Sequence, residues 1–229
     1  MLMSKTVNRL WELDFLRGVA ILLMVFFHLM YDLHEFYNLP IHYQEGFIFL
    51  TGKASATLFI LLAGVSCSLS KSNLKRGRNL LFIAILLTII TMIAVPGSNI
   101  IFGILHFLAI SILLYPIFHR WSPGILMVFG TIIIGLQYFT ALLTPSTNLL
   151  FPLGFISKDF FSVDYYPLIP YLGLFLYGIA LGKLLYPDKK SRFFYWSFAK
   201  PLILLGQHSL FIYLTHQPIL LLLLYLFFK

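Results

Sequence analysis

The stretch Phe15–Asp32, FLRGVAILLMVFFHLMYD, decides the fold of this chain. It is apolar over most of its length, yet it carries Arg17 and His28 with ten residues between them. A helix over this stretch is long enough to enter and largely cross a hydrocarbon core of about 30 Å. A charged side chain that faces lipid costs several kcal/mol. The polar residues must therefore face a bundle interior or a water-filled cavity.

The composition shows that the whole chain shares this character. Of its 229 residues, 60% are hydrophobic and only 10% are charged, whereas a soluble domain has about 25% charged residues. The single cysteine, Cys67, excludes an intramolecular disulfide and a cysteine-based metal cluster. We predict an all-α fold, one polytopic transmembrane helix bundle over residues 1–229. Its seven helices are expected at about 10–33, 46–70, 79–95, 99–118, 122–142, 165–185 and 201–227.

The lysines and arginines indicate how the bundle is oriented. With seven crossings, thirteen of the 16 basic residues, Lys5 and Arg9 among them, lie on the side of the N-terminus. Lys53, Lys158 and Lys229 lie on the other side. Because basic residues stay cytoplasmic, we predict a cytoplasmic N-terminus and an external C-terminus in a cell membrane, most simply a bacterial plasma membrane. The net charge of +8 then reflects this bias, with an attraction to anionic membrane lipid, and requires no nucleic acid.

Four ionisable groups of the first helix share one face. At about 100° per residue, a stripe about 60° wide holds Asp14, Arg17, His28 and Asp32. Arg17 and His28 are about 16 Å apart along the axis, so Arg17 lies toward the cytoplasm and His28 in the outer half. Either residue alone fits a snorkelling arginine or a histidine satisfied by a neighbouring helix. Four on one face favour a functional site.

Other helices carry further polar groups. Lys53 lies at a depth comparable with that of Asp32, and an ion pair between the two is expected, with a structural or a functional role. His106 lies near the middle of the fourth helix, and His216 lies on the last. Histidines can bind zinc, but no two of these have the i, i+4 spacing of a helical ligand pair, so we expect no metal.

Several of these segments resemble a known family. Residues 9–33, RLWELDFLRGVAILLMVFFHLMYDL, and 57–70, TLFILLAGVSCSLS, resemble the opening of the heparan-alpha-glucosaminide N-acetyltransferase catalytic domain in its short bacterial form. GILHFLAIS, DYYPLIPYLGLFLYGIALGK and LGQHSLFIYLTHQPIL resemble later segments, so the resemblance runs from about Arg9 to Leu220. In addition, Arg17 and His28 are similar to the arginine and histidine in the first span of membrane acyltransferases that O-acetylate surface polysaccharides.

The resemblance implies a membrane-bound acetyltransferase that takes acetyl-CoA from the cytoplasm and modifies a sugar, a glycan or a lipid-linked sugar on the outer side. The polysaccharide acetyltransferases place their proposed base at His28. The lysosomal enzyme has asparagine there and a catalytic histidine after the first helix, whose nearest counterpart here is His42, reached by allowing a gap. That enzyme also has about eleven spans, so the acceptor stays open, as does the choice between a monomer and a homodimer.

Acyl transfer from a thioester needs a base, donors for the oxyanion and a site that positions both substrates. We predict His28 or His42 as the base, with Asp32 beside it. The residues assigned to acetyl-CoA binding are Arg17, Asp14, Lys53, His106 and His216. A proton-coupled transporter or flippase is the alternative function, although the chain lacks the internal repeats that transporters often show. A structural or regulatory subunit leaves the polar stripe unexplained.

Overall fold

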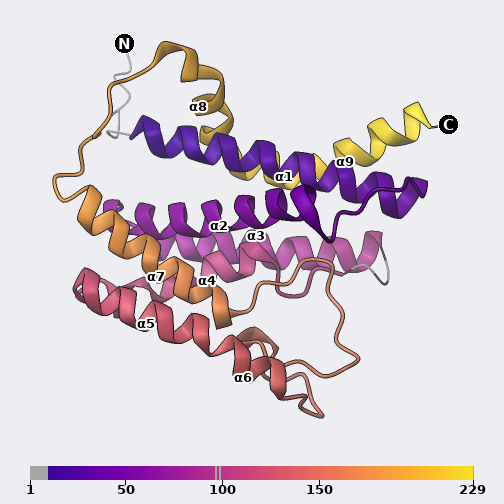
Figure 1. Cartoon of the computed structure of the whole chain (residues 1–229), viewed down its shortest axis with the longest axis horizontal. Coiled ribbons are helices and arrows are strands. Elements are labelled where there is room, and N and C mark those ends of the chain that lie inside the picture. The colour runs from indigo at the N-terminus through magenta and orange to yellow at the C-terminus, as the bar shows by residue number, and fades with distance from the viewer. Residues whose placement is uncertain (1–9, 96, 98, 229) are drawn as a thin grey trace. The chain divides into compact units, whose positions relative to one another are not determined.

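The computed structural model describes residues 10–95, 97 and 99–228 (Figure 1). The helices are α1 (Trp11–Tyr37), α2 (Gly46–Leu69), α3 (Asn73–Ala94), α4 (Ile104–Phe118), α5 (Pro123–Gly135), α6 (Gln137–Leu142), α7 (Leu168–Leu185), α8 (Lys200–Gln207) and α9 (Ser209–Phe227). Short 3-10 turns lie at Phe151–Leu153 and Ser197–Ala199. The predicted all-α fold is confirmed in these residues. Lys5, Arg9 and Lys229, which entered the charge count, lie outside them.

Six helical stretches of the described chain are long and apolar enough to cross a membrane: α1, α2, α3, Pro123–Thr140, α7 and α9. The fourth predicted span differs, because α4 has only 15 residues and is about 22 Å long. It begins at Ile104, where the backbone N–H donates to Oδ2 of Asp164 at 2.9 Å. The last predicted helix also differs, since it divides at His208 into α8 and α9.

The described helices belong to two compact units, Met1–Leu62 with Asp188–Lys229 and Ala63–Pro187. In the first unit, α8 crosses the start of α1 at very short range. A Cβ atom on Gly206 would overlap the carbonyl of Asp14, and one on Gly18 would overlap the carbonyl of Leu202. After His208 the chain turns, and α9 follows α1 toward Tyr37. The rings of Tyr37 and Phe228 have their centroids 4.5 Å apart.

The close crossing of α1 and α8 predicts a large cost for a side chain at Gly206. We expect Gly206→Ala to destabilise the protein by about 1–3 kcal/mol, since overpacking forces the two backbones apart. Thermal unfolding in nanodiscs, followed by intrinsic fluorescence, measures the loss. Gly135→Ala is the matched control, because a Cβ there meets open space. Equal unfolding temperatures for the two variants would contradict the close crossing.

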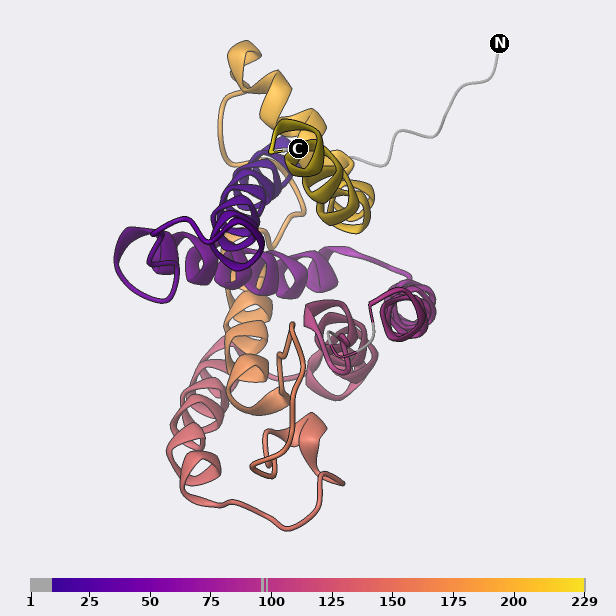
Figure 2. The same ribbon diagram turned by 90° about the vertical axis from the view of Figure 1, so that its right-hand side faces the viewer.

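The second unit holds the end of α2 together with α3, α4, α5, α6 and α7. Within it α5 and α7 lie side by side (Figure 1 and Figure 2), and a Cβ atom on Gly173 would meet the carbonyl of Gly130. Asp164, which caps α4, lies just before α7. At the other ends of these helices, Nζ of Lys183 donates to the carbonyls of His119 and Trp121. Therefore α4 and α7 run in the same direction.

Candidate active site

Helices α1 and α9 of the first unit bring together four polar side chains, His28, Asp32, His216 and Gln217. The imidazole rings of His28 and His216 meet edge to face, with centroids 4.7 Å apart and planes at 77°. One turn along α1, Oδ1 of Asp32 accepts a hydrogen bond of 2.6 Å from Nε2 of Gln217. The sequence alone assigned His28, Asp32 and His216 to a site. In the structure His28 lies against His216, and Asp32 is joined to Gln217, the residue that follows His216.

Backbone hydrogen bonds fix the tautomer of both histidines. Nδ1–H of His28 donates to the carbonyl of Met24 at 2.9 Å. Nδ1–H of His216 donates to the carbonyl of Tyr213 at 2.6 Å. A carbonyl oxygen only accepts, so the neutral rings carry their proton on Nδ1 and a lone pair on Nε2. Each Nε2 therefore has a lone pair with which it can accept a hydrogen bond.

The site has more hydrogen-bond acceptors than donors. Asp32 is fully buried. Among the described residues, three buried atoms lack a hydrogen-bond partner here: Oδ2 of Asp32, Oε1 of Gln217 and Nε2 of His216. Buried polar atoms without partners are costly and are normally satisfied by water or a ligand. The cluster is thus suited to a molecule that presents N–H or O–H groups.

Gln217 is the member that sequence reasoning missed. It is uncharged, and a helical wheel of α9 does not distinguish it from other polar residues on that helix. The available signal was its place in the Thr215–Pro218 run THQP, directly after His216. Gln217 holds Asp32 in place, because its amide donates a hydrogen bond to Oδ1 of that carboxylate.

Lys53 does not form the expected ion pair with Asp32. Its side chain is exposed, and Nζ lies 5.3 Å from the centre of the Phe49 ring. The face of α2 toward α1 is formed by Gly52, which packs against Phe27, and by Ser55, whose hydroxyl donates to the carbonyl of Ala20 at 2.8 Å. Lys53 follows Gly52 by about 100° around the helix, so it points away from that contact. The ion-pair prediction was wrong.

Arg17 and Asp14 pair with each other near the start of α1. The guanidinium NH1 donates to Oδ1 of Asp14, three residues earlier on the same face. The side chain of Asp14 is 5% exposed and that of Arg17 is 25% exposed. The buried carboxylate therefore orients an arginine whose side chain remains partly exposed. This pair lies about 16 Å along α1 from His28.

His106 lies in the second unit and has the opposite tautomer. The hydroxyl of Thr88 donates its proton to the carbonyl of Ile100 at 2.6 Å. It therefore accepts at 3.2 Å from Nε2–H of His106, which leaves a lone pair on Nδ1. Nδ1 is buried and has no partner among the described residues. The ring also stacks on Phe102, with centroids 5.9 Å apart.

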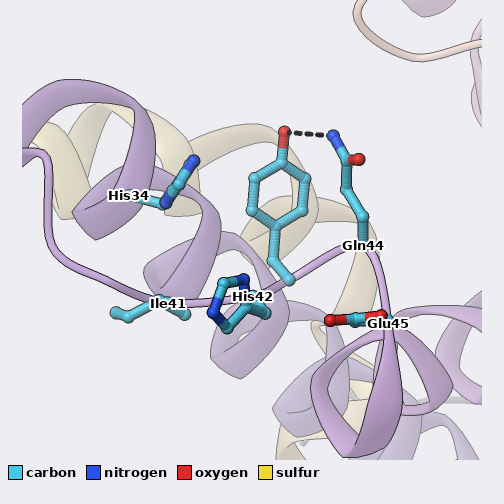
Figure 3. A pocket seen from close by; sticks show the side chains of 6 residues that line it. His34, Ile41, His42, Gln44 and Glu45 are labelled. Atoms are coloured by element: carbon cyan, nitrogen blue, oxygen red, sulfur yellow. Dashed lines mark hydrogen bonds between the residues drawn. The ribbon is translucent and has the colours of Figure 1, made fainter.

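His42 lines a cavity of about 350 Å³ beyond the end of α1. Figure 3 shows its neighbours: His34 from α1 and, from the following loop, Ile41, Tyr43, Gln44 and Glu45. The loop is held because the Tyr43 hydroxyl donates to the Glu35 carboxylate at 2.7 Å. This bond, with burial, raises the pKa of Tyr43, so the phenol stays protonated. The cavity is open and polar, and His42 is exposed in it.

Residues 10–95, 97 and 99–228 contain no group of three or more His, Cys, Asp or Glu side chains arranged to hold a metal ion. The cluster of His28, Asp32, His216 and Gln217 consists of imidazole, carboxylate and amide groups, which can form hydrogen bonds with a substrate.

Comparison with known proteins gives this site a context. The family model described as heparan-alpha-glucosaminide N-acetyltransferase, catalytic, matches residues 9–218. No curated protein and no solved structure matches the chain significantly. The matched residues include α1 and the part of α9 that carries His216 and Gln217. The chain belongs to the heparan-alpha-glucosaminide N-acetyltransferase catalytic-domain family.

Proposed function

We propose that the protein is a membrane-bound acetyltransferase that moves an acetyl group from cytoplasmic acetyl-CoA to a sugar or glycan acceptor at the outer side. Family membership supports acetyl transfer within a membrane. The observation that carries the proposal is the His28 imidazole, whose Nδ1–H is committed to the Met24 carbonyl and whose Nε2 is able to accept a proton beside His216.

In the proposed reaction His28 is the general base. A hydroxyl or amine of the acceptor gives its proton to Nε2 of His28 as its oxygen or nitrogen attacks the thioester carbonyl carbon. The carbon–sulfur bond then breaks, and the proton on His28 passes to the departing CoA thiolate. Asp32, one helical turn from His28, stabilises the imidazolium while the proton is held there.

His216 and Gln217 orient the acceptor and the carboxylate. Because Nδ1–H of His216 already donates to Tyr213, the neutral ring has only an acceptor to offer. We therefore assign Nε2 of His216 to accepting a hydrogen bond from the sugar that receives the acetyl group. The neutral ring has no second N–H with which to donate to an oxyanion. Gln217 fixes Asp32 through its amide N–H, and its own Oε1 accepts a further hydrogen bond from the substrate.

Arg17 is proposed to bind the phosphates of CoA. Asp14 orients its guanidinium, which suits the planar, charged contact that phosphates make with arginine. The separation of about 16 Å between Arg17 and His28 is comparable with the length of an extended pantetheine arm. The thioester of a CoA held at Arg17 would thus reach His28.

The acceptor is proposed to enter through the cavity lined by His34 and His42. His34 lies six residues beyond His28, or about 9 Å along the axis of α1, which is within the reach of a small sugar unit. His42 is the competing base in this arrangement, because it is exposed to the cavity. Separate alanine variants, described in the Discussion, distinguish the two histidines.

A cytoplasmic N-terminus and an external C-terminus require an odd number of crossings. The parallel course of α4 and α7, tied at both ends through Asp164 and Lys183, supports a crossing by the short α4.

Cys67 is the only cysteine and is buried, so single cysteines can report topology in a Cys67→Ser background. We expect Lys71→Cys to be labelled by an impermeant maleimide only after cells are opened. Lys158→Cys should react in intact cells, and the reverse pattern would contradict the proposed entry side of CoA.

Radiolabelled acetyl-CoA and the purified protein in nanodiscs test the activity itself. Incubation with a panel of hydroxyl-bearing and amine-bearing sugars should give labelled product with at least one of them. A separate assay uses the protein in sealed vesicles. If these vesicles accumulate unmodified sugar and no labelled product forms in nanodiscs, the transporter is favoured instead.

A further inference from the structure

The segment 189–200 carries an unusual set of exposed aromatic side chains. Five of them are between 57% and 94% exposed: Phe193, Phe194, Tyr195, Trp196 and Phe198. Large apolar surfaces of this kind normally mark a contact with a membrane or a partner. They are not used by the proposed reaction, so they need another explanation.

Basic residues flank these aromatic side chains. Lys189 and Lys190 precede them and Lys200 follows them, and all three are exposed. Arg192 lies between the lysines and the aromatic run, and residues 189–200 contain no Asp or Glu. The segment therefore combines positive charge with apolar surface, a combination that complements the boundary of an anionic bilayer.

The backbone of the segment is fastened to the first turn of α1. The buried carboxylate of Glu12 accepts hydrogen bonds from the Ser191 hydroxyl at 3.0 Å and from the Arg192 backbone N–H at 3.1 Å. Nε1–H of Trp11 donates to the carbonyl of Phe193 at 3.3 Å, and its ring meets Tyr195 edge to face. These contacts hold the segment in place while its aromatic side chains remain exposed.

The attachment point places the segment at the edge of the membrane. Helix α1 has 27 residues and is about 40 Å long, which exceeds the hydrocarbon thickness of about 30 Å. Trp11 and Glu12 are its first two residues, so they lie at the level of the headgroups. Trp and Tyr are enriched at this level, and basic side chains there contact lipid phosphates.

We propose that residues 189–200 form a docking surface for anionic phospholipid in the leaflet that surrounds the start of α1. The aromatic rings enter the boundary between headgroups and acyl chains, and Lys189, Lys190 and Lys200 contact the phosphates. A lipid occupant is favoured over the phosphates of a nucleotide because Phe194, 94% exposed, loses its contact with water only in an apolar medium. This inference does not depend on the proposed reaction.

Tryptophan quenching by brominated lipid tests the proposal. The full chain is placed in nanodiscs of phosphatidylcholine and phosphatidylglycerol, with bromine on the acyl chains of one lipid or the other. The signal of Trp196 is the difference between the unsubstituted protein and Trp196→Phe. We expect brominated phosphatidylglycerol to quench Trp196 more strongly than brominated phosphatidylcholine. The difference should correspond to an enrichment of phosphatidylglycerol around Trp196 of about fivefold or more, which is the effect of one basic side chain in contact with anionic lipid.

Two triple variants supply the charge control. Replacing Lys189, Lys190 and Lys200 by Gln should remove the preference for phosphatidylglycerol while Trp196 is still quenched by either lipid. Replacing Lys71, Lys75 and Arg78 by Gln removes the same charge elsewhere and should preserve the preference. The proposal is overturned if Trp196 escapes both brominated lipids, if it is quenched equally by both in the unsubstituted protein, or if acetyl-CoA displaces the lipid from it.

Discussion

Replacing His28 by alanine is expected to lower the turnover of acetyl transfer by about 10²-fold or more, while the affinity for CoA changes little. A positioned base typically contributes 10²–10⁴-fold, because the acceptor is a poor nucleophile until its proton is taken. The variant loses the imidazole ring that meets His216 and, with it, the lone pair on Nε2. Initial rates with radiolabelled acetyl-CoA, together with CoA binding by calorimetry, separate the two effects.

His119→Ala is the matched control for this variant. Its Nδ1–H also donates to a backbone carbonyl, that of Pro116 at 2.7 Å, but it belongs to the second unit and is not one of the four residues of the cluster. It should leave turnover unchanged. If His28→Ala keeps near-normal turnover and His42→Ala does not, the base is His42. If both stay active, neither histidine is the base.

Arg17→Ala is expected to weaken CoA binding about ten- to a hundredfold, since a hydrogen bond to a charged group is worth about 1.5–3 kcal/mol. Arg17→Lys should restore only part of the affinity, because an ammonium group cannot make the two-pronged contact of a guanidinium. Calorimetric titration of the folded protein with CoA measures both changes.

Arg120→Ala removes an equal charge from an exposed position and should leave CoA affinity unchanged. An Arg17→Ala protein that folds and binds CoA normally would reduce Arg17 to a partner of Asp14 in the packing of α1.

The sequence predicted the parts of this fold that depend on apolar length and on one helix at a time. The first three spans and the shared face of His28 and Asp32 follow from local hydrophobicity and the helical repeat. The division at His208 was not predicted, because residues 201–227 read as one largely apolar helical stretch that is long enough to cross a membrane. Just before the division, Gly206 lies against the Asp14 carbonyl, a contact between residues that are distant in sequence.

The partners of the candidate site were less predictable than its members. Depth alone suggested that Lys53 would meet Asp32, since Asp32 lies near the end of α1 and Lys53 near the start of α2, the next helix along the chain. The rotation of α2 about its axis decides otherwise, and that rotation is set by the packing of Gly52 against Phe27. Likewise, Asp32 accepts a hydrogen bond from Gln217 and does not pair with Lys53. This contact depends on how α9 lies along α1.

Sealed proteoliposomes test the central claim most directly. Radiolabelled acetyl-CoA is supplied only outside, and the sugar that proves to be the best acceptor in nanodiscs is trapped inside. We expect labelled, acetylated sugar in the vesicle interior with the unsubstituted protein, and at least about 10²-fold less with His28→Ala. Product that forms only when donor and acceptor share one side, or equal product from His28→Ala vesicles, would contradict transfer across the membrane by this histidine.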